Sequence, residues 1–454
     1  MENVEYLKIN LPEDVMKLKC NGNFDEEEKL INSLMKRDIP EVLKKKLCLE
    51  KEIIKIIKGE YPYTFEEALK VGKENIEDFT EEELIMLKED GTADWIFING
   101  EVYFQDSFCG TIIKTREEFA KRAMDKDKIN NNEKEYEFLN NIIREIKEKG
   151  TKSYFVHLRS KMKIKDDSIK EGKQIKVHIP IPAKSKQLSD IKIINTVPEA
   201  KNINDEDYKQ RTVYFEENIT DNNREFSVEY SYKSTVNYVE LKPEEVSDIQ
   251  PDFEINELPP HIMFTPYIRE LCKEIVKDEK NPLIKAKKIY EFVTTKVKYS
   301  FVREYFTIEN IAEYAGLNLK GDCGAQAILF ITLCRCAGIP AKWQSGLFAS
   351  PLSVGCHDWA QFYIAPYGWL FADPSFGGSA YRKGDKERWK FYFGNIDPFR
   401  MVANSEFQYE LYPSKKFLRI DPYDNQRGEA EYEHMGLGKE ALEVTRETIE
   451  FKEL

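Results

Sequence analysis

The first 150 residues are dominated by helical spacing of apolar positions. Between residues 25 and 89, Leu and Ile recur three and four positions apart among Glu and Lys, a pattern that predicts amphipathic helices. Residues 96–104 contain Asn99-Gly100 between β-forming residues, which is typical of a tight hairpin turn. Residues 117–149 are again helical and heavily charged. We therefore expect residues 1–150 to form a helical, charged N-terminal region with one small hairpin.

From residue 151 the period of the apolar positions changes to two. Ile175, Val177 and Ile179 share one face, and later segments alternate in the same way between turns rich in Asn and Asp. Strict alternation predicts half-buried strands, and several short strands in succession favour a sandwich. We expect residues 151–242 to form a β-sandwich-like domain. Residues 243–260 are acidic, have no period and are interpreted as a linker.

The remaining chain mixes the two periods. Residues 264–298 have helical spacing, a long apolar run begins after residue 321, and two short strand-like segments follow residue 355. We assign residues 261–400 to a third, compact domain, and residues 401–454 to a C-terminal extension that packs on it and ends in a short helix over residues 440–451. The whole pattern predicts the α+β class, with helices and strands segregated along the chain.

Composition narrows the possible partners and the compartment. The chain has 454 residues, 41% of them hydrophobic and 33% charged, with a formal net charge of −13, so a globular protein of two or three domains is expected. The negative charge argues against binding to nucleic acid or to an anionic membrane. An acidic start and the lack of an 18-residue apolar window predict neither a signal peptide nor a transmembrane helix, and we expect a cytoplasmic protein with reduced cysteines.

The strongest candidate for chemistry is Cys323. It lies in a Gly-Asp-Cys-Gly turn, residues 321–324, that leads into an apolar run without Gly or Pro before Gly338. This order predicts a loop followed by a buried helix, with Asp322 as a possible N-cap and Cys323 in the first turn. Unpaired N–H groups and the helix dipole favour a thiolate there and lower the pKa of a cysteine. Cys323 is therefore a candidate nucleophile.

Two later residues complete a candidate triad. His357 opens a strand-like segment, and Asp373 ends a second one directly before Pro374. A base and the acceptor that orients it need such rigid supports within hydrogen-bond reach of each other. We expect His357 to act as general acid and base, and Asp373 to fix its tautomer and orientation.

The hairpin between the two strands poses a problem of register. A four-residue loop, 365–368, would place His357 opposite Phe376, three positions past Asp373, so a bulge or a later pairing is expected. Asp358 is the local competitor for His357, but adjacent residues on a strand point to opposite faces.

These residues resemble the core of the transglutaminase-like superfamily. The resemblance rests on Gly-x-Cys at a helix start, Ala-Gly-Ile-Pro-Ala-Lys at residues 337–342, His-Asp-Trp-Ala-Gln and Gly-Trp-x-x-x-Asp-Pro. It covers roughly residues 270–400 and implies a papain-like fold with a triad of Cys323, His357 and Asp373. One departure is Asp358, where the family commonly has Ala.

The resemblance leaves the reaction open, because the superfamily includes proteases, amidases, cross-linking enzymes and inactive scaffolds. We expect acyl transfer on an amide of a protein or peptide through a thioester, and favour hydrolysis because water is always available. The alternatives are a protein-glutamine γ-glutamyltransferase and a non-catalytic binding module.

Aromatic residues and possible metal ligands complete the candidates. Trp343, Trp359 and Trp369 are predicted to wall a substrate groove, although core packing is the usual role of Trp in strands. The spacing of Cys334, Cys336, Cys356 and His357 does not suit zinc. No phosphate-binding loop or calcium loop is found in the sequence, and no metal or other cofactor is expected.

Overall fold

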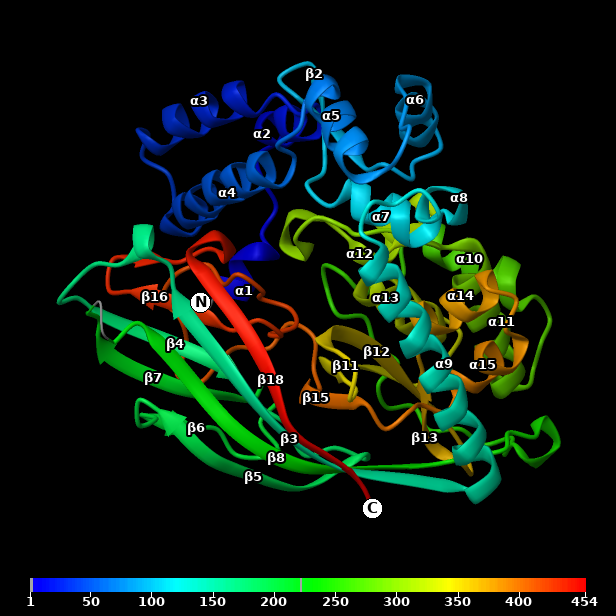
Figure 1. The fold of residues 1–454 in the computed structure, drawn as a ribbon. Helices are drawn as coiled ribbons and strands as arrows, with labels where there is room; N and C mark the ends of the chain where they lie inside the picture. The colour runs from blue at the N-terminus through cyan, green and yellow to red at the C-terminus, as the bar shows by residue number, and fades with distance from the viewer. Residues whose placement is uncertain (1–2, 221–222) are drawn as a thin grey trace. The chain divides into compact units, whose positions relative to one another are not determined.

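The computed structural model describes residues 3–220 and 223–454, so the first two residues of the predicted N-terminal region lie outside it. The chain divides into two compact units. The first unit comprises Met1–Lys134, Lys298–Glu309 and Lys320–Asp322, and the second unit comprises the rest (Figure 1). Two short segments of the predicted 261–400 domain therefore fold with the N-terminal residues, which corrects that boundary.

The first unit is mainly helical, as the spacing predicted. Two of its helices begin with capping boxes, in which Thr64 and Glu67, and then Thr80 and Glu83, exchange side-chain and backbone hydrogen bonds. Its helices are α1 (Asn3–Leu7), α2 (Glu13–Cys20), α3 (Phe24–Met35), α4 (Glu41–Glu60), α5 (Phe65–Asn75), α6 (Glu81–Glu89), α7 (Phe108–Thr115) and α8 (Glu117–Ala120). The helix α9 (Lys126–Lys149) begins in this unit and ends in the second.

The predicted hairpin is confirmed in the first unit. Strands β1 (Trp95–Ile98) and β2 (Glu101–Phe104) pair with Ile98 opposite Glu101. Asn99 and Gly100 have φ of 50° and 91°, the left-handed conformations that a two-residue hairpin turn requires. The unit also contains the short parallel pair β9 (Lys298–Tyr299) and β10 (Lys320–Gly321), which ends two residues before Cys323.

The second unit contains the predicted sandwich. One sheet has the order β18-β3-β8-β5 and the other β17-β16-β4-β7-β6. Alternate residues are buried along the long strand β3, and the rings of Phe215 and Phe226 from the two sheets lie 5.5 Å apart, so the core lies between the sheets. The strands within 151–242 are β3 (Thr151–Ile164), β4 (Gln174–Pro180), β5 (Leu188–Val197), β6 (Asn202–Ile203), β7 (Thr212–Asn218) and β8 (Glu225–Asn237).

The C-terminal residues differ from the prediction. The expected helix over 440–451 is wrong, because β18 (Leu442–Glu453) pairs with β3 along almost its whole length. Its Glu residues suggested a helix, but its Val, Thr and Ile residues suit a pleated surface with a partner strand. β16 (Glu429–Tyr432) and β17 (Met435–Gly436) join the other sheet. Much of the predicted C-terminal extension thus completes the sandwich.

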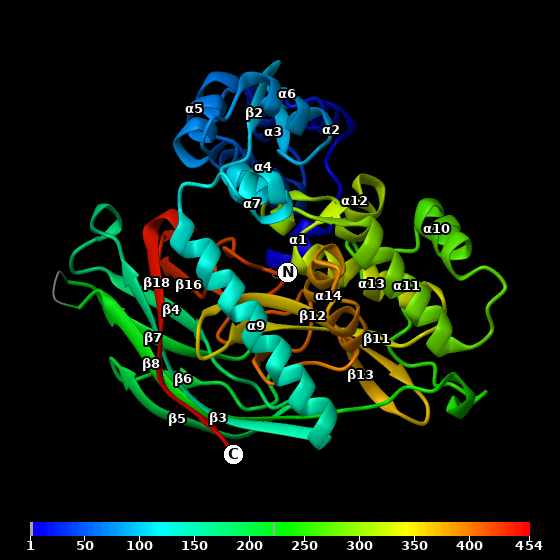
Figure 2. The same cartoon turned by 45° about the vertical axis from the view of Figure 1, so that its right-hand side comes forward.

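A second antiparallel sheet carries the candidate site. Its order is β14-β13-β12-β11-β15, formed by β11 (Ala341–Ala349), β12 (Val354–Ile364), β13 (Gly368–Ala372), β14 (Phe393–Gly394) and β15 (Arg400–Asn404). The helices around it are α10 (Pro266–Val276), α11 (Pro282–Lys296), α12 (Ile311–Asn318), α13 (Cys323–Cys336), α14 (Pro374–Arg382) and α15 (Lys386–Phe391). Figure 2 shows these helices on one side of β11–β13 and the sandwich on the other. The α+β prediction is confirmed.

The predicted linker, residues 243–260, has little regular structure beyond a single 3-10 turn, Pro243–Glu245. It nevertheless packs on the second unit, since Arg335 bonds Glu254 at 2.6 Å and Phe253 contacts the ring of Trp369. Within the described ranges, no helix has both the length and the apolar character needed to cross a bilayer.

Candidate active site

Cys323 is the first residue of α13, as the sequence predicts. The helix is buried from Gly324 to Cys334 and packs on β11 and β12, where Phe330 contacts Phe362 with ring centroids 5.8 Å apart. This packing holds the start of the helix against the strand that carries His357. Cys323 as a residue is partly exposed.

His357 and Asp373 form a buried pair. His357 lies on β12, and its Nε2 is 2.8 Å from Oδ2 of Asp373. Asp373 ends the hairpin and caps α14, since its Oδ1 accepts the backbone N–H of Phe376 at 3.0 Å. When Nε2–H donates to the carboxylate, Nδ1 is the ring atom left to take a proton.

The register of β12 and β13 explains how these two side chains meet. Ile364 pairs with Gly368 and Ala360 with Ala372, so the loop is one residue shorter than the four-residue loop considered above. Continued by one residue, the same register places Asp373 opposite residue 359, which shares the face of His357. Because a one-residue change exchanges the faces of a strand, the expected bulge is not needed in this hairpin.

Arg400, on β15, was missed by the sequence reasoning. Its Nη2 donates to Oδ2 of Asp373 at 2.8 Å, and its Nη1 donates to Oδ1 of Asp397 at 3.0 Å. Arg400, Asp373 and Asp397 are all fully buried. One guanidinium therefore compensates two carboxylates away from water, and the same Asp373 oxygen that receives His357 also receives Arg400.

A glycine allows β15 to approach this site. Gly346 pairs with His357 across β11 and β12, and β11 has a register shift against β15 at the same point. A Cβ on Gly346 would lie 2.1 Å from the carbonyl oxygen of Met401, which no side chain tolerates. The missing side chain thus lets the strand that carries Arg400 pack beside the strand that carries His357.

The charges at the pair follow from burial and from the neighbours. Burial opposes the charged form of Asp373, but His357 and Arg400 together hold the pKa of that carboxyl well below its usual range. Burial lowers the pKa of His357 below its usual value, with Asp373 opposing the shift. The pair is therefore an ionised carboxylate and a neutral imidazole near pH 7.

The Cys323 thiol contacts the neighbour of His357. Cys323 Sγ donates to Oδ2 of Asp358 at 3.4 Å, and Gln426 donates to the other oxygen of Asp358 at 2.5 Å and to the His357 carbonyl at 3.0 Å. Asp358 points to the opposite face of β12 from His357, as the alternation of side chains along a strand requires. There it contacts Cys323 at the start of α13. The structure thus pairs two members of the predicted triad, His357 and Asp373, and places the third, Cys323, in contact with Asp358.

The tryptophans that were predicted to wall a substrate groove pack against other side chains. Trp343 and Trp359 are 2% and 0% exposed, and Trp359 donates through Nε1 to Oε1 of Gln344 at 2.8 Å. Trp369 pairs with Tyr363, six positions along β12 from His357. All three pack, and only Trp359 contacts the site, through a stacked arrangement with His357. The predicted substrate-binding role is therefore corrected to packing for the buried Trp343 and Trp359, whereas for the partly exposed Trp369 it stays a prediction.

Arg400, Asp358 and Gln426 are the site residues that sequence reasoning did not assign. Arg400 and Gln426 lie after the last recognisable motif, and no local pattern marks either of them. Asp358 could have been found from its departure from the family's usual Ala. Among the residues that the structure describes, no group of three or more His, Cys, Asp and Glu side chains could hold a metal ion.

Comparison with known proteins finds a similarity over the segment that contains Cys323, His357 and Asp373. Residues 269–374 match the profile of the Transglutaminase-like superfamily. An uncharacterised protein of Haemophilus influenzae is 29% identical over 212 residues, which are 39% of this chain and 57% of that protein. The match thus spans little more than half the length of that relative.

Solved structures with a partial likeness come from other bacteria. A candidate cysteine protease from Cytophaga hutchinsonii has a TM-score of 0.41 at 13% identity, with 66% of this chain and 91% of that chain covered. The periplasmic domain of TgpA from Pseudomonas aeruginosa has a TM-score of 0.29 at 13% identity, with 55% of this chain and 95% of that domain covered.

Proposed function

Because residues 269–374 belong to the transglutaminase-like superfamily, we propose that this chain is a cysteine-dependent enzyme that transfers an acyl group from an amide. The substrate would be a carboxamide of a protein or peptide. Cys323 would be the nucleophile, His357 the general acid and base, and Asp373 the group that orients His357. Arg400 would keep Asp373 ionised and in place.

The reaction follows from these roles. The Cys323 proton passes to Nδ1 of His357, and the sulfur attacks the amide carbon to form a tetrahedral intermediate. The amide C–N bond then breaks, and the imidazolium gives its proton to the departing amine. His357 next takes a proton from water, which attacks the thioester and releases the acid and the free thiol. The backbone N–H of Cys323, at the start of α13, is the natural donor to the oxyanion.

The observation that carries this proposal is the buried arrangement of His357, Asp373, Arg400 and Asp397. Burying two carboxylates and a guanidinium is costly, and apolar residues of similar volume often give equal stability. A binding module would gain little from this arrangement, whereas a general base needs a fixed and correctly protonated imidazole. The arrangement thus favours catalysis over a purely structural role for the fold.

The first test is to trap an acyl-enzyme. The full chain is incubated with p-nitrophenyl acetate, quenched in acid, and measured as an intact protein followed by peptide mapping. We expect an acetyl thioester on Cys323 that is lost in Cys323→Ala and forms far more slowly in His357→Ala. Cys356→Ala is the matched control, since Cys356 lies beside His357 on β12 and has no proposed role in the reaction.

The second arm separates hydrolysis from cross-linking. Glutamine-containing peptides are incubated with the enzyme in water alone and with a primary amine, and ammonia release and amine incorporation are measured. We expect ammonia release without a requirement for the amine. Amine incorporation in excess of hydrolysis would identify a γ-glutamyltransferase instead. Acetylation of the exposed Cys20 and Cys48 without labelling of Cys323 would contradict an enzymatic role.

A further inference from the structure

The hydrogen bond between Cys323 and Asp358 is not explained by the proposed reaction. The thiol of Cys323 donates to a carboxylate oxygen at 3.4 Å, and Asp358 is only 2% exposed. A carboxylate that accepts the S–H proton stabilises the neutral thiol, and its negative charge opposes a thiolate at the same place. The start of α13 has the opposite effect on Cys323. The two influences act on the same sulfur atom.

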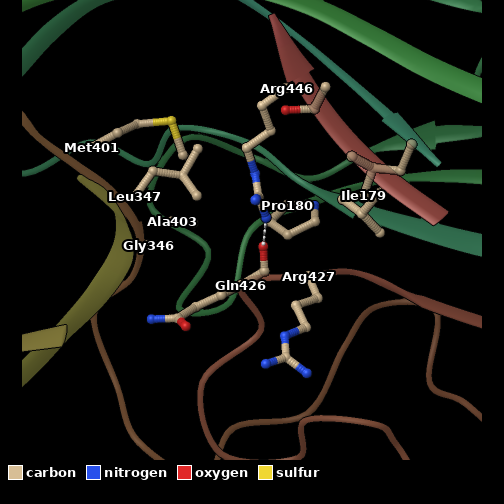
Figure 3. Close-up of a pocket in the computed structure, with 11 residues that line it drawn as sticks. Ile179, Pro180, Gly346, Leu347, Met401, Ala403, Gln426, Arg427 and Arg446 are labelled. Carbon is tan, nitrogen blue, oxygen red and sulfur yellow. Dashed lines mark hydrogen bonds between the residues drawn. The ribbon is translucent and has the colours of Figure 1, made fainter. Parts of the chain in front are cut away.

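Asp358 is held in this position by the C-terminal part of the chain. The side-chain amide of Gln426 donates to Asp358 Oδ1 and to the carbonyl of His357. Arg446 on β18 in turn donates to the backbone carbonyl of Gln426 at 2.8 Å (Figure 3). Its Nη2 also lies 3.5 Å from the sulfur of Cys356. The cavity that Gln426 and Arg446 help to line measures ≈ 10 Å³, room for about one water molecule.

Two further carboxyl groups face this cluster from the segment before β16. Asp421 accepts the backbone N–H groups of Asp424, Asn425 and Gln426 through its two side-chain oxygens. Burial, together with the negative charges of Asp421 and Asp358, raises the pKa of Asp424 well above its usual value. Burial and these two neighbours thus favour the protonated form of Asp424. A further carboxyl group, that of Asp322, directly precedes Cys323 and accepts a hydrogen bond from the Tyr305 hydroxyl at 2.6 Å.

We propose that Asp358 is the resting acceptor of the Cys323 proton and restrains formation of the nucleophile until the thiol turns from Asp358 to His357. This inference rests on the proposed function. In the resting state the S–H bond points to Asp358, with the carboxylate held by Gln426. For reaction, the S–H group turns to Nδ1 of His357 and the proton transfers there, which leaves a thiolate and an imidazolium. No oxidant or other reactant is needed.

The choice of Asp358 over His357 as resting acceptor has a chemical reason. A carboxylate is a much weaker base than a thiolate, so accepting a hydrogen bond from the Cys323 thiol does not make Asp358 the base. The neutral imidazole of His357 is closer to a thiol in proton affinity and can take the proton. Asp358 thus contacts the reacting sulfur but opposes its ionisation, whereas His357 promotes it.

The test is the pH dependence of iodoacetamide labelling of Cys323, followed by intact mass and peptide mapping, in wild type and Asp358→Asn. Loss of the carboxylate should move the labelling midpoint down by at least about one pH unit, so that labelling at pH 6 becomes about tenfold faster or more. Asp358→Glu, which keeps the charge, should restore slow labelling at pH 6. Asp424→Asn is the matched control and should label more like wild type than Asp358→Asn does, because burial and its acidic neighbours raise the pKa of Asp424 and none of the contacts described above joins it to the thiol.

Three results would overturn the inference. An unchanged midpoint in Asp358→Asn would make the contact structural only, and an upward shift would mean that Asp358 supports the thiolate through His357. If Asp358→Asn does not fold, labelling of the wild-type protein alone tests the inference. The inference then requires that Cys323 at pH 6 labels no faster than the exposed Cys20 and Cys48, and faster labelling contradicts it.

The labelling experiment and the acyl-enzyme experiment can fail separately. Labelling measures only the thiol, whereas the acetyl thioester and ammonia release measure acyl transfer. A downward shift in Asp358→Asn without any acyl-enzyme would uphold the restraint and refute the proposed enzyme. An acyl-enzyme with an unchanged midpoint would do the reverse.

Discussion

The two ends of the candidate site differ in how their charges are balanced. At the His357 end, the carboxylate of Asp373 is paired with a histidine and an arginine and is fully buried. At the Cys323 end, the thiol lies 3.4 Å from a carboxylate that is held by a neutral amide. The first end has its charges paired within the protein, whereas in the proposed reaction the second end would have to form a thiolate beside a carboxylate.

This difference separates two tasks within one site. Preorganised charges around His357 fix the base without any movement during the reaction. In the proposed reaction, the contact between Cys323 and Asp358 would instead be exchanged for a contact with His357. The His357 end should therefore be sensitive to every change of charge, while the Cys323 end should tolerate changes and respond in its pH dependence.

The largest effect is expected for Asp373→Asn. An amide in this position no longer holds the imidazole in the required tautomer, and in the serine protease template the corresponding change costs about 10⁴ in rate. We expect a loss in kcat of the same order, measured with an activated ester substrate. Asp397→Asn is the control, because Asp397 also bonds Arg400 but is not the partner of His357. An equal loss in both variants would show that the two carboxylates act only through stability.

The next effect is expected for Arg400→Met. Removing the guanidinium leaves Asp373 and Asp397 buried without their cation, and loss of one partner of a buried pair typically costs about 3–5 kcal/mol. Urea denaturation should show this decrease in the free energy of unfolding, and Arg400→Lys should recover part of it. A decrease below about 1 kcal/mol would mean that water reaches the carboxylates.

The pH dependence distinguishes the two ends directly. Burial lowers the pKa of His357, so the neutral base persists as the pH falls below 6.5 and is lost only at its lower pKa. The acid limb of kcat/KM should therefore lie below pH 6.5. The labelling midpoint of the wild-type Cys323 thiol should lie well above that limb, because Asp358 opposes the thiolate. If the acid limb of kcat/KM and the labelling midpoint of Cys323 fell at the same pH, the proposed difference between the two ends would be contradicted.

The smallest effect is expected for Gln426→Met, which removes the amide that holds Asp358. A hydrogen bond to a charged group is worth about 1.5–3 kcal/mol, and we expect a loss of unfolding free energy in the lower part of that range. The acid limb of kcat/KM should not move, since the carboxylate of Asp373 remains in place. A shift of that limb would show that Gln426 acts on the base through its bond to the His357 carbonyl.

Local chemistry made several features predictable from the sequence. Asn99-Gly100 specified its hairpin because both residues adopt φ above zero at low cost. Cys323, His357 and Asp373 were found because a turn before an apolar run, a strand start and an acid before proline are all local signals. The alternating positions of 151–242 predicted strands, since one face of each is buried.

Other features depend on neighbours that are distant in the chain. The sequence of β18 taken alone favours a helix. In the structure it is a strand, because pairing with β3 outweighs the helix propensity of its Glu residues. The shorter turn before Gly368 decided which face of the sheet carries Asp373, and a change of one residue would have reversed it. Trp343 and Trp359 could have lined a groove or a core, and only packing distinguishes the two.

By itself, the amino-acid sequence determined the α+β class, the helical and alternating regions, and the three residues proposed for acyl transfer, because each depends on contacts within a few positions. Only the tertiary structure decided that Arg400 reaches Asp373, that Asp358 reaches Cys323, and that Gln426 holds Asp358. Those contacts join strands and loops from separate parts of the chain. Electrostatic interactions depend on distance in space, and the order of residues does not contain that distance.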